Sequence, residues 1–125
     1  IRLLNERKNQ IYAVRGNCEA EVDQMVLDFP VMADYCILAI EGKTMYATHG
    51  HIYNKDNLPP MMDGDILIHG HTHVLKAENM GNYILLNPGS VSIPKEGNPP
   101  TYAILENGIF TIKDFEGNTV REITL

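Results

Sequence analysis

Hydrophobic and polar positions alternate in short runs over most of this chain, a pattern that predicts β-strands more often than helices. Three such runs occupy the C-terminal part, at 101–105, 109–115 and 119–124. Asn-Gly at 107–108 and Gly-Asn at 117–118 separate these runs. Because both dipeptides are typical of tight hairpin turns, we expect three antiparallel strands here.

The middle of the chain predicts further strands. Residues 35–40 and 43–47 flank a Glu-Gly turn and form another hairpin pattern. Shorter apolar runs predict strands at 65–68, 74–78 and 83–86. The C-terminal two-thirds of the chain is therefore expected to be mostly antiparallel β-structure.

The N-terminal segment has a different pattern. Apolar residues recur at helical spacing from Val22 to Phe29, which predicts a helix over 19–27 that ends before Pro30. Residues 1–8 read as the tail of another helix, because no Ser, Thr, Asp or Asn cap precedes them. We therefore expect the chain to be a piece of a longer protein. A short strand is predicted at 10–14.

The composition is that of one globular domain, covering 1–125, with 44% apolar and 21% charged residues. A net charge of −6 disfavours binding to nucleic acid. No apolar run approaches the ~18 residues of a membrane span, so no membrane association is expected. Two cysteines are too few for a disulfide-framed secreted module, and no signal peptide is recognised. A cytoplasmic location is expected.

The five histidines carry the chemical signal. All lie between positions 49 and 73, directly after apolar strands. A strand places residues i and i+2 on one side, so His71 and His73 can point into one cavity. Neutral imidazole is the commonest protein metal ligand, and the clustering favours a metal site over five unrelated packed or surface histidines. Beside them Asn17 offers an oxygen ligand, which favours Mn²⁺, Fe or Mg²⁺ over Zn²⁺.

Four ordered blocks carry a family resemblance: V-R-G-N-C-E at 14–19, A-T-H-G-H at 47–51, I-H-G-H-T-H at 68–73 and N-P-G-S-V-S-I-P at 87–94. Together they resemble the calcineurin-like metallophosphoesterase superfamily, and within it the small bacterial YfcE-type phosphodiesterases. The resemblance spans nearly the whole chain. It implies an α+β fold, a four-layer α/β/β/α sandwich that is mostly β here and lacks the N-terminal strands.

The resemblance also implies a function and its ligands. The expected activity is hydrolysis of a small phosphodiester by a hydroxide that two divalent metal ions activate. The family pattern assigns Asn17, His49 and His71 to one ion and His73 to the other. Manganese is the expected metal, with iron, nickel or zinc as alternatives.

Two further residues, Cys18 and His51, are candidates for roles beside the metal ligands. Cys18 stands where the broader superfamily often has a phosphate-facing histidine, so Cys18 either faces the phosphate or is a small packed residue. His51 is expected to bind a phosphate oxygen or to orient His49. His69 is expected to be packed and without a catalytic role. The turn at 87–90 is expected to shape the site beneath the histidines.

The family's opening D-x-H and G-D blocks have no counterpart here; they would occupy about 60 residues in two strand–helix units. Every ligand assigned above is neutral. Two divalent ions ~4 Å apart repel by about 4 kcal/mol even at a dielectric constant of ~80, and no bridging carboxylate offsets this. Residues 1–125 alone are therefore not expected to form a competent two-metal enzyme. Association into a homo-oligomer is expected.

Two other classes of function compete with this interpretation. The same fold serves as a protein-binding scaffold in the retromer coat, but a scaffold has little reason to keep Asn17, His49, His71 and His73 together. A transition-metal carrier leaves the N-P-G-S and G-N-C blocks unexplained. No motif in the sequence identifies the natural substrate. The only long irregular loop that could cover a specificity pocket is the one at 52–62.

Overall fold

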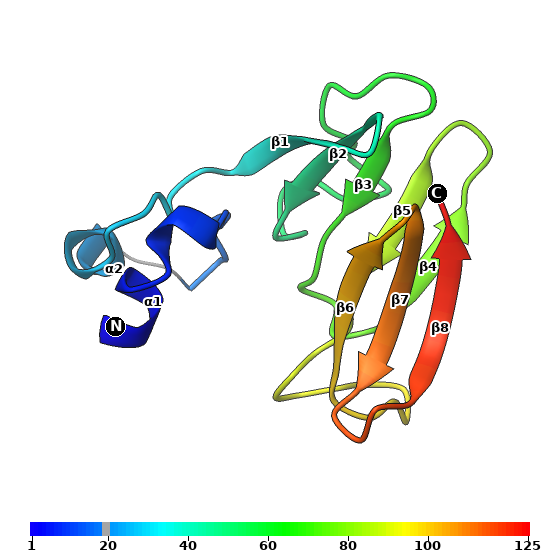
Figure 1. Ribbon diagram of the computed structural model, residues 1–125. Helices are drawn as coiled ribbons and strands as arrows, with labels where there is room; N and C mark the ends of the chain where they lie inside the picture. The colour runs from blue at the N-terminus through cyan, green and yellow to red at the C-terminus, as the bar shows by residue number, and fades with distance from the viewer. Residues whose placement is uncertain (19–20) are drawn as a thin grey trace.

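The computed structural model describes residues 1–18 and 21–125, and two β-sheets form its main body (Figure 1). The strands are β1 (Tyr35–Ile40), β2 (Lys43–Thr48), β3 (Ile66–Ile68), β4 (Lys76–Asn79), β5 (Ile84–Asn87), β6 (Thr101–Glu106), β7 (Ile109–Asp114) and β8 (Thr119–Thr124). The first sheet has the order β1-β2-β3-β5-β4 and the second the order β6-β7-β8. The mostly β, α+β fold is confirmed.

The hairpins form where the turn chemistry predicts them. Strands β1 and β2 pair antiparallel with Tyr35 opposite Thr48, and β6, β7 and β8 form a continuous antiparallel meander. The β4–β5 pair is antiparallel as well. These connections are short, so the turn residues decide the register locally.

The expectation of antiparallel pairing is wrong at the centre of the first sheet. Strand β3 runs parallel to β2 on one side and to β5 on the other. Both connections are long enough to return the chain to the same end of the sheet, which parallel pairing requires. As a result, the carboxyl ends of β2, β3 and β5 meet along one edge.

The hydrophobic core lies between the two sheets. Buried residues from the first sheet face Phe110 and Ile112 of β7. This cluster consists of Met45, Ile66, Leu75, Leu86, Phe110 and Ile112. A second cluster, Tyr46, Leu67, Tyr83 and Leu85, covers the opposite face of the first sheet. Successive residues of β2, β3 and β5 are thus buried on both faces, as is typical of parallel strands.

The N-terminal segment stands to one side of the sheets, before β1 (Figure 1). It contains α1 (Arg2–Asn5), the 3₁₀ turn η1 (Lys8–Gln10) and α2 (Glu21–Val26). Both predicted helical regions are therefore confirmed over the described residues, while residues 19–20 lie outside them. No described helix is long and apolar enough to cross a membrane.

The predicted strand at 10–14 is wrong. The chain there leaves η1 as an extended segment. Its Ile11 N–H donates back to the Lys8 carbonyl at 3.5 Å, and just after the segment the Arg15 N–H donates to the Ala33 carbonyl at 2.7 Å. A β-rich sequence becomes a strand only where a neighbour completes its hydrogen bonds.

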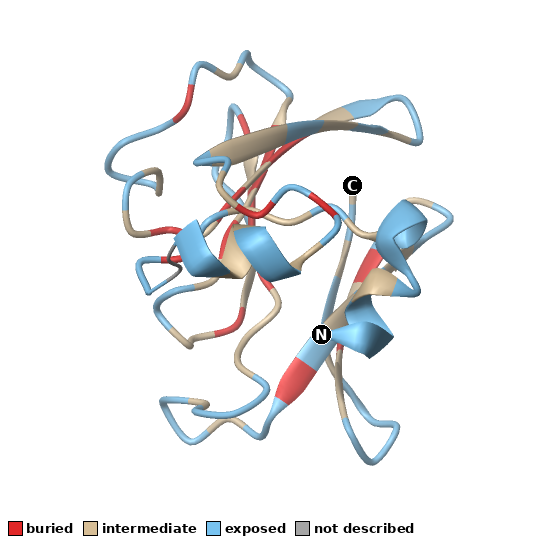
Figure 2. Cartoon of the chain, turned by 90° about the vertical axis from the view of Figure 1, so that its left-hand side faces the viewer, coloured by how far each residue is buried: buried red, intermediate tan, exposed pale blue. Residues whose placement is uncertain are grey.

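The apolar side of α2 is largely exposed, with Met25 82% and Val22 58% accessible (Figure 2).

Candidate metal centre

The carboxyl ends of the parallel strands bring the histidines together. His49 directly follows β2 and His69 directly follows β3. The two loops are joined by a backbone hydrogen bond from the Gly70 N–H to the His49 carbonyl at 2.9 Å. The His69 N–H in turn donates to the Leu86 carbonyl of β5 at 3.0 Å. Three strands therefore determine the position of the histidine loops.

Three imidazole rings share one space at this edge. The ring centroid of His49 lies 5.0 Å from that of His51 and 5.0 Å from that of His71. The centroids of His51 and His71 are 6.2 Å apart. The structure thus places residues from two separate loops in contact, although 20 positions separate His51 from His71 in the sequence (71 − 51 = 20).

The G-H-T-H loop is held in a strained backbone conformation. His71 has φ of 68° and His73 φ of 62°, in the left-handed region that costs a non-glycine residue about 1–2 kcal/mol. Nδ1 of His73 is also buried and lacks a hydrogen-bond partner within the described residues. Backbone strain and an unsatisfied buried nitrogen both occur preferentially at functional sites.

The side chain of Asn87 holds the G-H-T-H loop in place through hydrogen bonds. Its amide donates to the Gly70 carbonyl at 3.1 Å and to the Thr72 hydroxyl at 3.1 Å, while its oxygen accepts from the Gly89 N–H at 2.9 Å. Asn87 is 2% exposed. The predicted shaping role of the turn at 87–90 is confirmed by these bonds.

His69 is packed, as the sequence predicts. It is 7% exposed, and its Nδ1–H donates to the Gly70 carbonyl at 2.9 Å. Burial lowers the pKa of His69, and the neighbouring charges of His71 and Lys76 lower it further, although the bond to Gly70 acts in the opposite direction. The ring is therefore neutral near pH 7.

Asn17 and Cys18 lie in the loop before α2, and both are exposed. Cys18 lines a small hollow of about 260 Å³ with residues such as Leu27 and Val31. The proposed roles of Asn17 and Cys18 stay predictions. Cys36 is half-buried on β1, where burial raises the pKa of its thiol, in keeping with a structural role.

The donors present fit part of a metal centre. Neutral imidazoles at a shared edge suit a divalent transition metal, and the unpartnered Nδ1 of His73 is a buried nitrogen that a metal could satisfy. Among residues 1–18 and 21–125, no three His, Cys, Asp or Glu side chains are arranged to hold one ion. An amide ligand such as Asn17 would have to complete the set of His49 and His71.

Comparison with known proteins decides the family. Residues 2–108 match the calcineurin-like phosphoesterase superfamily domain. The chain belongs to this superfamily. Phosphodiesterase YfcE of Escherichia coli strain K12 is 46% identical over 109 residues, which are 87% of this chain and 59% of YfcE. The chain thus spans less than two-thirds of that relative's length.

Two further comparisons agree with this membership, and a third shows the same fold. A solved structure of YfcE, a phosphoesterase from E. coli, superimposes with a TM-score of 0.93 at 40% identity, covering 98% of this chain and 68% of that one. The probable metallophosphoesterase YsnB of Bacillus subtilis is 26% identical over 121 residues, 88% of this chain and 67% of YsnB. Vps29 from Chaetomium thermophilum shares the fold, with a TM-score of 0.55 at 15% identity over 89% of this chain and 65% of that one.

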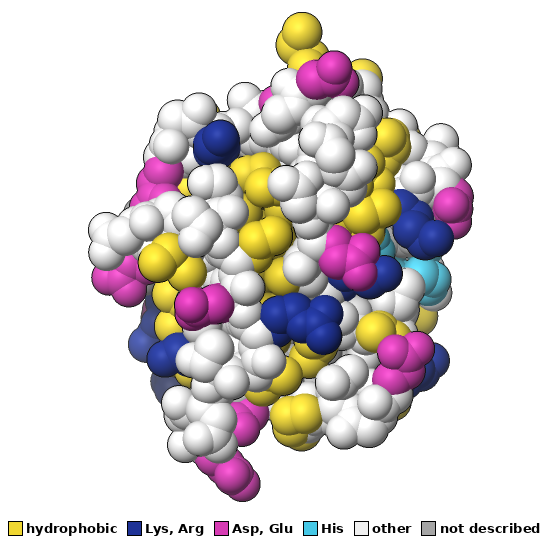
Figure 3. Space-filling view, turned by 90° about the vertical axis from the view of Figure 1, so that its right-hand side faces the viewer, with side chains coloured by type: hydrophobic (Ala, Val, Ile, Leu, Met, Phe, Trp, Pro, Cys, Tyr) yellow, Lys and Arg dark blue, Asp and Glu magenta, His cyan; other side chains and the backbone are white. Residues whose placement is uncertain are grey.

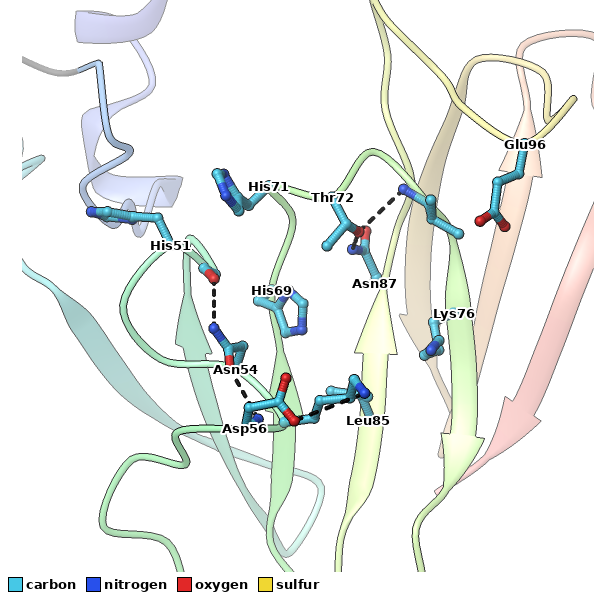
Figure 4. A pocket seen from close by; sticks show the side chains of 13 residues that line it. His51, Asn54, Asp56, His69, His71, Thr72, Lys76, Leu85, Asn87 and Glu96 are labelled. Atoms are coloured by element: carbon cyan, nitrogen blue, oxygen red, sulfur yellow. Dashed lines mark hydrogen bonds and ion pairs between the residues drawn. The ribbon is translucent and has the colours of Figure 1, made fainter.

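In this calcineurin-like chain a cavity of about 430 Å³ opens beside the histidines (Figure 4). One part of the cavity is lined by His51, His69 and His71. Another part is lined by Asn54, Lys55 and Asp56, so the loop at 52–62 borders this pocket. The remaining lining residues are Gly50, Thr72, Val74, Lys76, Leu85, Asn87 and Glu96. Sequence reasoning missed Lys76 and Glu96 because neither belongs to a motif; only the pairing of β4 with β5 brings Lys76 beside Asn87.

Proposed function

We propose that the protein containing this chain is a metal-dependent phosphodiesterase. The observation that carries the proposal is the cluster of His49, His51 and His71 at the carboxyl ends of parallel strands, in a chain 46% identical to an E. coli phosphodiesterase. A strained G-H-T-H loop and the unpartnered nitrogen of His73 support it. Two divalent ions, when bound, would polarise the phosphoryl oxygens and supply a hydroxide near neutral pH.

The residues of the chain have distinct tasks in this proposal. Asn17, His49 and His71 hold one ion, and His73 contributes to the other. His51 lies within hydrogen-bond distance of His49, at 3.0 Å between the two Nδ1 atoms, and orients that ligand or binds a phosphate oxygen. Cys18 faces the phosphate.

Metal identity, location and assembly complete the proposal. The oxygen of Asn17 favours manganese over an all-nitrogen zinc site. We propose a cytoplasmic protein that acts on a small phosphodiester and assembles as a homo-oligomer. Lys and Arg side chains are interspersed with Asp and Glu over the face shown in Figure 3, an arrangement that does not favour a polyanionic partner there.

The test compares wild-type and His71→Ala forms of the full-length protein. Wild type is expected to hydrolyse bis(p-nitrophenyl) phosphate with Mn²⁺, and His71→Ala to lose this activity together with bound metal, measured by elemental analysis. Cys18→Ala is the companion variant, expected to keep its metal and to change mainly turnover. Full activity of His71→Ala after chelation and dialysis would exclude the mechanism. Wild type that binds no Mn²⁺ and does not hydrolyse the substrate would favour the scaffold alternative.

A further inference from the structure

The cavity extends well beyond the histidines. Its volume of about 430 Å³ falls within the ~300–1,000 Å³ range of pockets that enclose a whole small ligand. His51 and His71 lie at one side of the cavity, while Lys76 lies at the opposite side, across His69 and Asn87 (Figure 4). A substrate whose phosphoryl group sits at the histidines has room to extend toward Lys76.

Lys76 is a half-buried cation that has no counter-ion within residues 1–18 and 21–125. It lies on β4 and makes no ion pair or side-chain hydrogen bond within the described part of the chain. Glu96 lines the same cavity but is exposed and does not approach Lys76 within ion-pairing distance. Because the Lys76 ammonium has no partner among the described residues, it is available to donate to an anionic ligand in the cavity.

Lys55, the other cation of the cavity, is different. Its Nζ lies 3.9 Å from the Asp56 carboxylate, and both side chains are more than half exposed, at 54% and 83%. The charge of Lys55 is therefore balanced locally and hydrated. The comparison singles out Lys76 as the group available for a ligand.

We infer that Lys76 binds a second anionic group of the substrate, a phosphate or a carboxylate remote from the scissile phosphoryl group. The inference rests on the proposed phosphodiesterase function and narrows its substrate class to phosphodiesters with an additional negative charge on one ester group. An ammonium is a strong donor to phosphate oxygens. Lys76 acts in binding and specificity and takes no part in the chemical step.

Two matched substrates test this role in the full-length protein with Mn²⁺. Thymidine 5′-(p-nitrophenyl phosphate) and its 3′-phosphorylated counterpart differ only in the second phosphate. Wild type is expected to prefer the 3′-phosphorylated compound about tenfold in kcat/KM, mainly through KM. Lys76→Met should lose this preference while its kcat/KM for the first compound stays within twofold. Lys76→Arg should restore the preference for the 3′-phosphorylated compound. Lys55→Met, which also removes one positive charge from the cavity, should keep that preference.

A binding measurement separates failure of this inference from failure of the proposed function. Calorimetry on metal-free protein compares thymidine 3′,5′-bisphosphate with thymidine 5′-monophosphate. Lys76→Met is expected to weaken binding of the bisphosphate about five- to tenfold and to leave the monophosphate unchanged. If wild type hydrolyses neither substrate, the proposed activity is wrong and calorimetry alone decides the role of Lys76. Equal substrate preference or equal bisphosphate affinity in wild type and Lys76→Met would overturn the inference.

Discussion

The Nδ1 atoms of His49 and His51 lie 3.0 Å apart, on either side of Gly50. At this distance the two rings can share a hydrogen bond, in which one Nδ1 carries the proton and the other accepts it. The pair exists because Gly50 turns the chain with φ of 116°, a conformation that L side chains rarely adopt. The turn after β2 therefore aims two histidines at the same space.

Replacing Gly50 by Ala should damage this turn. The added Cβ would lie 2.7 Å from Nδ1 of His69 and 3.1 Å from the Gly70 carbonyl oxygen. We expect a loss of about 2–4 kcal/mol in the free energy of unfolding, from backbone strain and crowding together. Urea denaturation measures it. Gly81→Ala is the matched control, since Gly81 has φ of 101° and no atom within 4 Å of its added Cβ. Equal losses in the two variants would show that crowding against His69 contributes nothing.

Asn87→Ala should loosen the G-H-T-H loop. The substitution leaves the Gly70 carbonyl and Thr72 hydroxyl without their buried amide donor, at a cost of about 1–3 kcal/mol in stability. Metal affinity should fall about 10- to 100-fold, because Asn87 supports the loop that carries the proposed ligands. Calorimetric titration with Mn²⁺ checks the affinity. Asn98→Ala is the control, because it removes a local side-chain bond to the Lys95 carbonyl and should leave the Mn²⁺ affinity unchanged. Unaltered Mn²⁺ affinity in Asn87→Ala would contradict the supporting role.

Ile112→Ala should weaken the packing between the sheets. Ile112 is fully buried in the inter-sheet core, where truncation leaves a cavity and costs about 2–5 kcal/mol. Thermal or chemical unfolding of the full-length protein measures this change in the free energy of unfolding. Ile104 on β6 is 41% exposed, so Ile104→Ala should cost about 1 kcal/mol or less. A small effect of Ile112→Ala would mean that the two sheets do not depend on this contact.

Asp114 should make the β7–β8 turn sensitive to acid. The Asn118 side chain, followed by backbone N–H groups in the turn, holds the pKa of Asp114 below its ordinary value. A depressed carboxyl pKa adds stability above the unfolded pKa of about 3.9, and that stability is lost as pH falls through the lower folded pKa. Asn118→Ala should raise the pKa of Asp114, read from its carboxyl resonance by NMR, and its stability deficit should shrink as pH falls from about 5 to 2. A deficit independent of pH would rule out this origin.

Much of the β-structure follows from the sequence alone. The hairpins at β1–β2, β6–β7 and β7–β8 depend on alternation and on turn residues such as Asn107-Gly108, which act within a few positions of one another. The histidines could be placed at strand ends for the same reason. The family blocks added the expected ligands, whose roles stay predictions.

Only the tertiary structure decided which strands became neighbours. The parallel pairing of β3 with β2 and β5 joins distant segments, and no local pattern distinguishes it from antiparallel pairing. That pairing places His71 beside His49 and puts Asn87 beneath their loops. Residues 10–14 have a strand-like sequence but no strand partner among the described residues. Lys76 lines the cavity because β4 pairs with β5. Turn chemistry is local and can be read from the sequence, whereas strand pairing and side-chain burial depend on groups that only the folded chain brings together.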